Sequence, residues 1–411
     1  MISVSEALQE LLSAFHPLES ETIPLSESAG RVLYDGIRSG IDLPLFTNSS
    51  MDGFAVRALD VSEASKNKPV ELSVIEDIPA GKNPTLTLAQ NQTSRIMTGA
   101  PVPKGADAVI PVEDTDQYDS KSRSTFDLSS TIKVFRPVKT GDFIRQQGED
   151  VKKNEIVLSA NSPLKPQELG ILAMLGIAKV PVFRKPKIAI LSTGDELVPV
   201  DQPLESGKIH DSNAYTLSAL IKRDYGNPEY LGIVPDNEDS VREFLESAAA
   251  NHADLILTSA GVSVGVFDYV KTVVESDGEL SFWRVNMRPG KPVAFGNYQG
   301  VPFIGLPGNP VSAFVGYEVF VRPAILKLSG ITAVPRYKVN ARLDEGIESD
   351  GRESYLRGIL QYINGEWVAH LTGHQGSGNL LSLVQANALL IIPSGVKSLP
   401  PGSVIDTWLL D

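Results

Sequence analysis

From Lys185 onward, uniformly apolar segments alternate with segments of helical character, and this alternation limits the fold more than any other feature of the chain. Strands of such composition are buried on both faces, which happens when helices cover both sides of a parallel sheet. We therefore predict a parallel, doubly wound α/β domain. Its predicted strands are KIAILS, EYLGIV, DLILTS and VPFIG. The predicted helices between them are SNAYTLSALIKRDYG, NEDSVREFLESAAA and FDYVKTVVES, and a last helix runs from Pro310 to Leu328, where Pro323 is expected to kink it.

Both flanks of this domain have a different pattern. The chain begins with a predicted helix, because Ser3 and Glu6 have the spacing of a capping box. The chain then continues to Val182 in Gly, Pro and short β-type runs, which predict small β-rich lobes. After Gly330 strand-like segments return, and Asn364-Gly365 predicts a hairpin within a small β-barrel or sandwich.

Charge and composition exclude several classes of function. The chain has 411 residues, a formal net charge of −13 and no cysteine. An acidic chain is not expected to bind nucleic acid or an anionic membrane, and the absence of cysteine excludes disulfides and thiolate zinc sites. There is no run of about 18 apolar residues that would span a bilayer. We expect a soluble, cytoplasmic protein.

The segment from Gly261 to Gly265 fits the pattern G-x-S-x-G, in which a serine on a tight turn attacks acyl groups. Ser263 is thus a candidate nucleophile, or the glycines form a cradle for an anion. A serine hydrolase also needs an acid and a histidine later in the chain, and that order is available. The possible partners are Asp344 or Asp350 with His370 or His374, all in the β-rich tail. An oxyanion loop such as H-G-G-G is missing, which disfavours the hydrolase.

Polar residues follow the predicted parallel strands at the edge where ligands bind in such sheets. Thr193 and Gly194 follow the first strand, and Ser259 ends a later one. Any single acid here could be a helix cap, but several acids at one edge favour a site for a hard cation, Mg²⁺ rather than zinc. The predicted metal residues are Glu196, Asp236 and Asp268, with Asp195 beside them.

Cations and a second glycine loop are expected at the same edge. Arg284, Arg288 and Lys291 lie within eight residues of one another, which in an acidic chain favours a phosphate-bearing ligand over a solvated basic loop. The loop GLPGNPVSA ends at a predicted helix N-terminus, which attracts anions. Its candidate residues are Pro307, Gly308, Asn309 and Pro310. Neither glycine loop is a Walker A sequence or a dinucleotide fingerprint.

Outside the α/β domain, the stretches NSSMDGFAV, SRIMTGAPVP, IRQQGEDV and TGHQGSGNL look too specific for ordinary turns. Turn residues remain the alternative interpretation for each of them. Their candidate functional residues are Asp52, Thr98, Arg145, Asp150 and Ser377.

These stretches, together with LSTGDELV, KIHDSNA, SAGVSVGVFDYVK, RPGKPVAFG and GLPGNPVSAF in this order, closely resemble the molybdopterin molybdenumtransferase family, which includes the C-terminal part of gephyrin. The resemblance covers essentially the whole chain. It implies an elongated homodimer whose subunit has four lobes. These would be a helical and β dimerisation segment (1–44 and 138–184), an inserted β-rich lobe (45–137), an α/β molybdopterin-binding domain (185–330) and a C-terminal β-barrel (331–411).

The resemblance also implies an activity. Members insert molybdenum from molybdate into adenylylated molybdopterin, with Mg²⁺-dependent hydrolysis of the adenylate and release of AMP. The acids at the sheet edge would handle metal, water or pterin, and the three cations would hold phosphate or oxyanion. Asp52, Thr98, Arg145 and Asp150 would complete the site from the other subunit. Molybdopterin adenylyltransferase and molybdoenzyme apoproteins would be partners.

Three positions depart from the family pattern. Ala260 stands where a second glycine is more usual, and Arg284 and Arg288 stand where many members have lysine. Arginine keeps its proton, so a step that needs a neutral amine is disfavoured while anion binding is not. Two alternatives within the family's chemistry stay open, an adenylyltransferase-like enzyme and a scaffold of the same fold without turnover.

Overall fold

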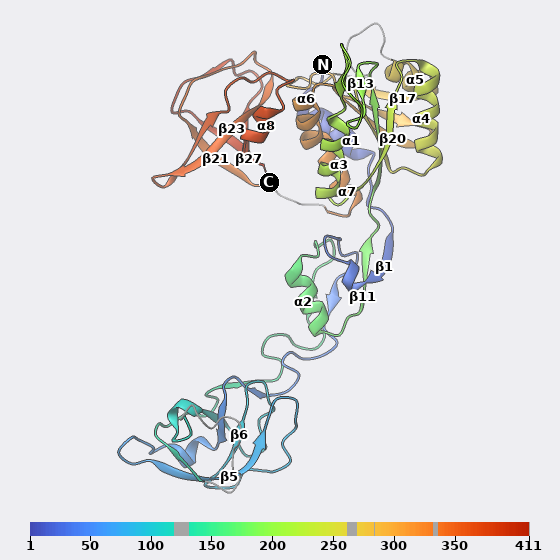
Figure 1. Ribbon diagram of the computed structural model, residues 1–411. Coiled ribbons are helices and arrows are strands. Elements are labelled where there is room, and N and C mark those ends of the chain that lie inside the picture. Colours follow the sequence, from blue (N-terminus) through green and yellow to red (C-terminus); the bar gives the residue numbers. More distant parts are fainter. Residues whose placement is uncertain (119–130, 261–268, 283, 332–335, 411) are drawn as a thin grey trace. The chain divides into compact units, whose positions relative to one another are not determined.

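The computed structural model describes residues 1–118, 131–260, 269–282, 284–331 and 336–410, which fall into two compact units (Figure 1). Unit 1 consists of Met1–Asp35, Ala160–Ala173 and Ile177–Asp411, and unit 2 of Gly36–Ser159 and Met174–Gly176. Among the residues that the structure describes, no helix combines the length and the apolar composition that a bilayer crossing requires.

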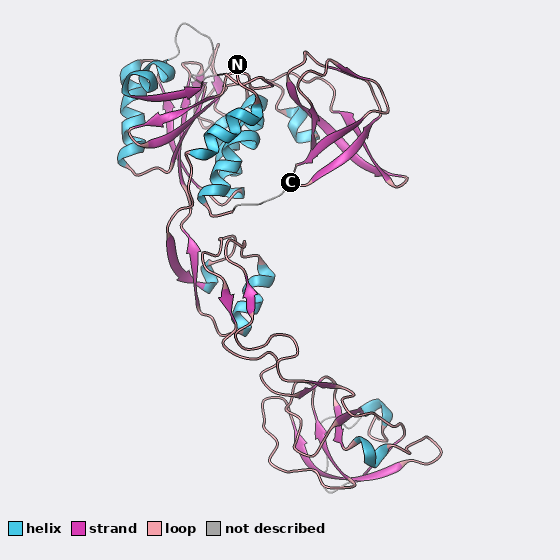
Figure 2. Ribbon diagram, turned by 180° about the vertical axis from the view of Figure 1, so that it is seen from behind, coloured by secondary structure: helices cyan, strands magenta, loops and turns pink. Residues whose placement is uncertain are grey.

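The centre of unit 1 is a six-stranded sheet with the order β15-β12-β16-β20-β19-β17. Figure 2 shows helices on both sides of this sheet. Its strands are β12 (Lys187–Thr193), β15 (Asn227–Val234), β16 (Leu255–Ser259), β17 (Gly278–Phe282), β19 (Ala294–Tyr298) and β20 (Val301–Leu306). The four strands β15, β12, β16 and β20 are parallel, as predicted. The prediction of a wholly parallel sheet is wrong at the other edge, because a two-residue turn at Gln299 and Gly300 joins β19 to β20 as an antiparallel hairpin.

Helices cover both faces of this sheet, because successive residues of each central strand point in opposite directions. Ile188 and Ile190 of β12 pack with one group of helices, and Ala189 and Leu191 pack with the other. The first group comprises α1 (Val4–Ser13), α3 (Asn213–Arg223), α6 (Pro310–Gly316) and α7 (Arg322–Leu328). The second comprises α4 (Glu238–Ala250) and α5 (Tyr269–Asp277), drawn on the opposite side of the sheet in Figure 1.

Two helix predictions have clear outcomes. Ser3 and Glu6 form the predicted capping box of α1. The predicted helix from Pro310 to Leu328 is present, but a π-helical segment, η4 (Tyr317–Val321), separates α6 from α7. The wider turns of η4 directly precede Pro323, which has no N–H and would clash with the carbonyl four residues earlier.

Shorter elements complete the rest of unit 1 outside its C-terminal part. β1 (Ser20–Pro24) pairs antiparallel with β11 (Lys179–Phe183), and β13 (Leu197–Val198) pairs with β14 (Ile209–His210). The remaining elements are η1 (Leu25–Glu27) and α2 (Pro166–Met174), which extends one residue into unit 2. Pro166 begins α2 as predicted.

The C-terminal part of unit 1 is a closed barrel and not a sandwich. Its ring has the order β23-β24-β21-β27-β25, and β25 pairs back onto β23. The strands are β21 (Lys338–Leu343), β23 (Glu353–Ile363), β24 (Glu366–Leu371), β25 (Ala388–Ile392) and β27 (Val404–Leu409), with β22 (Ile347–Glu348), β26 (Ser398–Leu399) and α8 (Leu381–Gln385) beside them. The predicted Asn364-Gly365 hairpin joins β23 to β24.

One strand crosses from the α/β part to the barrel. β18 (Met287–Arg288) follows β17 in the chain but pairs in parallel with β23, placing Met287 opposite Glu353 and Arg288 opposite Ser354. The predicted basic loop is therefore anchored to the barrel by its own main chain.

Unit 2 has a five-stranded sheet with the order β7-β4-β6-β5-β8. Buried side chains such as Phe54, Val56 and Ile110 form its core. Its elements are β2 (Ile37–Arg38), β3 (Asn48–Ser49), β4 (Gly53–Val56), η2 (Ala58–Val61), β5 (Val70–Ile78), β6 (Gln92–Ile96), β7 (Ala108–Pro111), η3 (Val112–Asp114), β8 (Thr131–Val134), β9 (Ile144–Arg145) and β10 (Ile156–Leu158). The predicted polar tip DSKSRST lies outside the described residues.

Candidate active site

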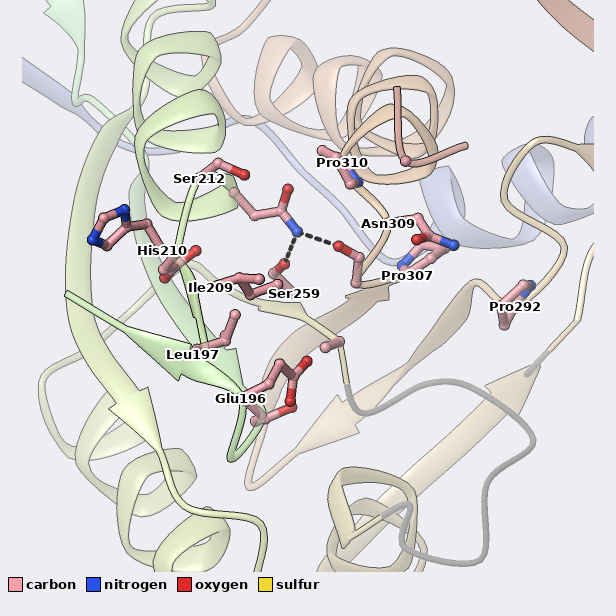
Figure 3. Close-up of a pocket in the computed structure, with 16 residues that line it drawn as sticks. Glu196, Leu197, Ile209, His210, Ser212, Ser259, Pro292, Pro307, Asn309 and Pro310 are labelled. Atoms are coloured by element: carbon pink, nitrogen blue, oxygen red, sulfur yellow. Dashed lines mark hydrogen bonds between the residues drawn. The ribbon is translucent and has the colours of Figure 1, made fainter. Parts of the chain in front are cut away.

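A cleft of about 600 Å³ lies at the carboxyl ends of β12, β16 and β20 (Figure 3). This is the edge of a parallel sheet where loops lead into helices and where ligands bind. The segment before α3 and the loop between β20 and α6 form the other walls. Several predicted site residues line the cleft, namely Thr193, Glu196, Ser259, Pro307, Gly308, Asn309 and Pro310.

The turn after β12 needs glycine and leaves a polar atom without a partner. A Cβ atom at Gly194 would lie 2.6 Å from Oε2 of Glu196, so only glycine lets the Glu196 side chain fold back beside the cleft. Thr193 is only 2% exposed, and its Oγ1 has no hydrogen-bond partner among the described residues. A buried hydroxyl without a partner costs free energy.

Asn213, at the start of α3, ties the walls of the cleft together. Its side-chain amide donates to Oγ of Ser259 at 2.6 Å and to the carbonyl of Gly308 at 2.8 Å, the two dashed lines in Figure 3. Asp211 caps the same helix by accepting the Ala214 N–H at 3.1 Å. One amide group therefore links the start of α3 to the end of β16 and to the loop that follows β20.

Replacing Asn213 by alanine is expected to lower the free energy of unfolding by about 1–3 kcal/mol, because it leaves buried polar groups unpaired. Denaturant unfolding of the full chain measures this change. The matched control is Ser212→Ala, since Ser212 lines the same cleft but makes no capping hydrogen bond. Equal stability of the two variants would show that the Asn213 bonds do not hold the loops.

Three of the predicted acids lie close together beside the cleft. The Asp195 N–H donates to Oδ2 of Asp236 at 3.4 Å, and the Asp236 N–H donates to Oδ1 of Asp195 at 3.3 Å. Partial burial raises the pKa of Asp236, and the charges of Asp195 and Glu196 raise it further. A bound cation would relieve this repulsion.

The described acids do not by themselves complete a metal site. Among the residues that the structure describes, no group of three His, Asp or Glu side chains is arranged to hold a metal ion. Asp268, the remaining predicted metal residue, lies outside the described residues, as do Gly261, Ser263 and Gly265. The Mg²⁺ site and the hydrolase alternative through Ser263 therefore stay predictions.

Ala260 adopts a backbone conformation that favours glycine. Its φ is +76°, and its Cβ is the atom closest to a Cβ built at Gly308, 3.1 Å away. Ala260→Gly is expected to raise the free energy of unfolding by roughly 0.5–1 kcal/mol, because it removes the left-handed strain of alanine. Ala249→Gly, inside α4, is the control and should change stability in the opposite direction. A loss of stability in both variants would contradict the strain.

A second cavity of about 360 Å³ adjoins the cleft, because Pro292, Pro307 and Asn309 line both. Its walls come from the β18 loop, the start of α6 and the C-terminal barrel, and it is strongly basic. The predicted residues Arg288, Lys291 and Ser377 line it, together with Arg352, Arg357 and Gln375, which the sequence did not single out.

Arg357 is the distinctive group of this basic cavity. It is 1% exposed and forms no ion pair among the described residues. Its guanidinium donates to Oγ of Ser382 at 3.0 Å and to the carbonyl of Gly376 at 3.1 Å, both neutral acceptors. Burial, aided by the charge of Arg288, lowers the pKa of Arg357 to about 10. A buried cation without a counterion is costly, and an anion in the cavity would offset that cost.

The other cations differ in how far they are neutralised. Asp350 accepts a hydrogen bond from Arg352 Nε at 3.0 Å, which lowers the pKa of Asp350 to about 2. Its Oδ2 also lies 3.9 Å from Nη1 of Arg288. Lys291 is exposed and makes no ion pair among the described residues. Arg284 is exposed and, unlike Arg288 and Lys291, lines neither of these two cavities.

The four predicted residues of unit 2 form two neighbouring pairs within that unit. Asp52 accepts from the Thr98 N–H at 2.8 Å and from its hydroxyl at 2.7 Å. Arg145 forms an ion pair with Asp150. β3 connects the pairs, because Asn48 pairs with Arg145 and Ser49 accepts the Gly99 N–H at 2.8 Å. These four residues therefore lie around β3, and their role in a functional site stays a prediction.

Three domain families match consecutive parts of the chain. Residues 2–176 match the MoeA N-terminal region (domain I and II), residues 189–327 match a probable molybdopterin binding domain, and residues 340–410 match the MoeA C-terminal region (domain IV).

Similar proteins match over nearly the whole chain. A molybdopterin molybdenumtransferase of Nostoc sp. is 39% identical, covering 93% of this chain and 87% of its own. One from Haemophilus influenzae is 37% identical over 98% of both chains. A crystal structure of the molybdopterin biosynthesis moeA protein from Pyrococcus horikoshii is 34% identical, with a TM-score of 0.81 and full coverage of both chains.

Proposed function

Because the chain belongs to the molybdopterin molybdenumtransferase family, we propose that it transfers molybdenum from molybdate to adenylylated molybdopterin at the edge of its central sheet. The observation that carries this proposal is the pair of adjoining cavities. The larger cleft has loop main chain, Asn213 and a threonine hydroxyl at its walls, and the smaller cavity holds a buried arginine; within the described part of the chain, the hydroxyl has no hydrogen-bond partner and the arginine no counterion. A ligand with a polar ring system and anionic groups fits this combination.

The two cavities would divide the substrates between them. In the cleft, Thr193 Oγ1 and the loop Pro307–Pro310 would contact the pterin, whose nitrogens and oxygens match such groups. In the basic cavity, Arg357, Lys291 and Ser377 would hold a tetrahedral oxyanion, molybdate. The shared wall of Pro292, Pro307 and Asn309 would place the oxyanion next to the dithiolene that receives the metal.

The acids beside the cleft suit cleavage of the adenylate. Glu196 and Asp236, with Asp268, would hold Mg²⁺, which neutralises the negative charge that develops as the phosphoanhydride bond breaks. Asp195 and Asp236 hold each other in place, because the main-chain N–H of each donates to the carboxylate of the other. Release of AMP then accompanies metal insertion.

We also propose that the protein acts as a homodimer in which Asp52, Thr98, Arg145 and Asp150 contribute from the second subunit. Mixing an Asp52→Asn chain with an Arg357→Met chain tests this. If the site is shared, a mixed dimer has one intact site and regains about half of the activity per dimer expected for two sites. A lack of recovery after demonstrated subunit exchange would contradict a shared site.

Molybdopterin adenylyltransferase would supply the substrate, and molybdoenzyme apoproteins would accept the product.

The experiment that tests the proposed function is incubation with adenylylated molybdopterin, Mg²⁺ and either molybdate or tungstate. AMP release and metal incorporation are measured together, and we expect both to rise in parallel. Consumption of ATP with attachment of AMP would indicate an adenylyltransferase instead. Binding of the substrate with neither product would indicate a scaffold.

A further inference from the structure

The basic cavity is built jointly by the α/β part of unit 1 and the C-terminal barrel. The α/β part supplies the β18 loop and the start of α6, and the barrel supplies Arg352, Arg357 and Ser377. At this seam the two parts are joined by main-chain hydrogen bonds and by apolar packing, because Tyr355 and Leu389 of the barrel belong to the buried cluster of the α/β part. β18 pairs with β23, and the Val311 N–H donates to the carbonyl of Ser377 at 3.0 Å. The position of Arg357 relative to Lys291 therefore depends on how the barrel is seated.

A second attachment of the barrel lies away from the cavity and consists of side chains. Arg336, which precedes β21, donates from Nη1 to Oε2 of Glu318 at 2.6 Å and from Nη2 to the Glu318 carbonyl. The same guanidinium lies 4.0 Å above the ring of Trp408 in β27. Arg336 thus connects η4 of the α/β part with the wall of the barrel, and its side chain is only 13% exposed.

The connection continues from Trp408 to the strand that carries Arg357. Trp408 packs against Tyr355, with ring centroids 5.2 Å apart. Tyr355 is 1% exposed and lies in β23 two residues before Arg357, and its hydroxyl donates to Glu353 at 2.5 Å. Side chains at i and i+2 lie on the same face of a strand, so a shift of Tyr355 carries Arg357 with it.

Glu318 is a buried anchor for this connection. It lies in η4, is 1% exposed, and accepts a second ion pair from Arg223 of α3 at 2.7 Å. π-Helical turns are uncommon and are frequent at functional sites. Here the turn presents both the carboxylate and the carbonyl of one residue to Arg336.

We propose that Arg336 is a positioning residue, which seats the C-terminal barrel on Glu318 and thereby places Arg357 in the oxyanion cavity. This inference rests on the proposed function for the identity of the oxyanion, but the seating of the barrel does not. A purely structural role for the ion pairs of Glu318 would predict that any arginine on this carboxylate matters equally.

Arg223 provides the matched control. It pairs with the same Glu318 carboxylate, but both of its ends lie in the α/β part, on α3 and η4. Arg336→Met cuts the connection to the barrel, whereas Arg223→Met weakens the anchor without cutting that connection. The two variants therefore separate barrel placement from loss of a buried ion pair.

The first measurement is the dissociation constant for molybdate, determined by calorimetry on the full chain. Arg336→Met is expected to weaken molybdate binding about tenfold, because Arg357 would be displaced by up to about an ångström from its position in the cavity. Arg223→Met should stay within about twofold of the original chain, and Arg336→Lys, which keeps the charge over Trp408, should recover part of the loss. Equal weakening in Arg336→Met and Arg223→Met would overturn the proposal.

The second measurement reports the seating directly and needs no ligand. Because the chain has no cysteine, spin labels can be placed at Tyr362→Cys, 64% exposed in the barrel, and at exposed Glu243→Cys in α4. The distance distribution, recorded with labelled chains diluted by unlabelled ones, should broaden in Arg336→Met and stay narrow in Arg223→Met. An unchanged distribution in Arg336→Met would contradict the proposal.

Two further arms keep the outcomes separate. If Arg336→Met does not fold, Trp408→Leu removes the aromatic contact without unpairing Glu318, and it should broaden the same distribution. Failure of the original chain to bind molybdate would count against the proposed function, while the distance measurement would still decide whether Arg336 seats the barrel.

Discussion

Replacing Arg357 by methionine is expected to weaken molybdate binding by roughly two orders of magnitude, because truncating one partner of a buried charge interaction typically costs about 2–5 kcal/mol. Methionine has a similar length and fills the space without a charge. Calorimetry with molybdate measures the affinity. Arg342→Met is the matched control, since Arg342 belongs to the same barrel but is exposed and paired with Glu366.

The same substitution should change the stability of the empty protein only slightly. Burial lowers the pKa of Arg357 to about 10, so the folded state holds its proton less tightly than the unfolded state. The resulting penalty is fully present at pH 7 and disappears only as the pH rises through 10 toward the ordinary value for arginine. Arg357→Met removes this penalty but also the hydrogen bonds to Ser382 and to the Gly376 carbonyl, so its melting temperature without oxyanion should lie close to that of the original chain. Added molybdate should raise the melting temperature of the original chain but not that of Arg357→Met. Binding within about threefold of the original would contradict the oxyanion role.

Replacing Asp236 by asparagine is expected to lower molybdenum insertion roughly 100-fold or more while raising the melting temperature at neutral pH. The loss follows if this carboxylate holds Mg²⁺ at the site of adenylate cleavage. The higher melting temperature follows because burial and neighbouring acids raise the pKa of Asp236, so its charged form destabilises the folded state at neutral pH and asparagine removes that charge. The assay is AMP release with metal incorporation, and Asp201→Asn, an exposed acid of the same domain, is the control.

The sign of the pH dependence gives a second check on Asp236. A carboxyl group with a raised pKa favours the folded state at low pH, and that contribution is lost as the pH rises through the folded-state pKa. The stability difference between Asp236→Asn and the original chain should therefore be largest at neutral pH and shrink as the pH falls toward 3.8, the ordinary value for aspartate. A constant difference across this range, or normal insertion activity, would sink the assignment.

The sequence predicts the elements that have a strong local signal. β12 and β16 are buried on both faces, and an uninterrupted apolar run indicates this directly. The Ser3 capping box and the Asn364-Gly365 turn depend on residues within a few positions of each other, so they are also readable. The gathering of Asp195, Glu196 and Asp236 follows from topology, since parallel strands end at one edge.

What the sequence does not predict depends on contacts that are distant along the chain. Arg357 stands within SYLRGIL, where a single arginine is typical of a solvent-facing position on a strand. Its burial results from closure of β23 onto β25 and from the loop at Gly376, and neither leaves a local pattern. Asn213 stands within KIHDSNA, but its role depends on Ser259 and Gly308, which are distant in sequence and lie beside it only in the folded chain.

The pairing of β18 with β23 has a consequence for recombining parts of this protein. A chimaera that exchanges the barrel at the linker after Gly330 would separate Met287 and Arg288 from the strand they pair with. The exchangeable module is therefore discontinuous in sequence, and a graft would have to carry Met287 and Arg288 along with residues 336–410. Homologous segments joined at that linker alone would inherit a mismatched seam, even where each part folds correctly by itself.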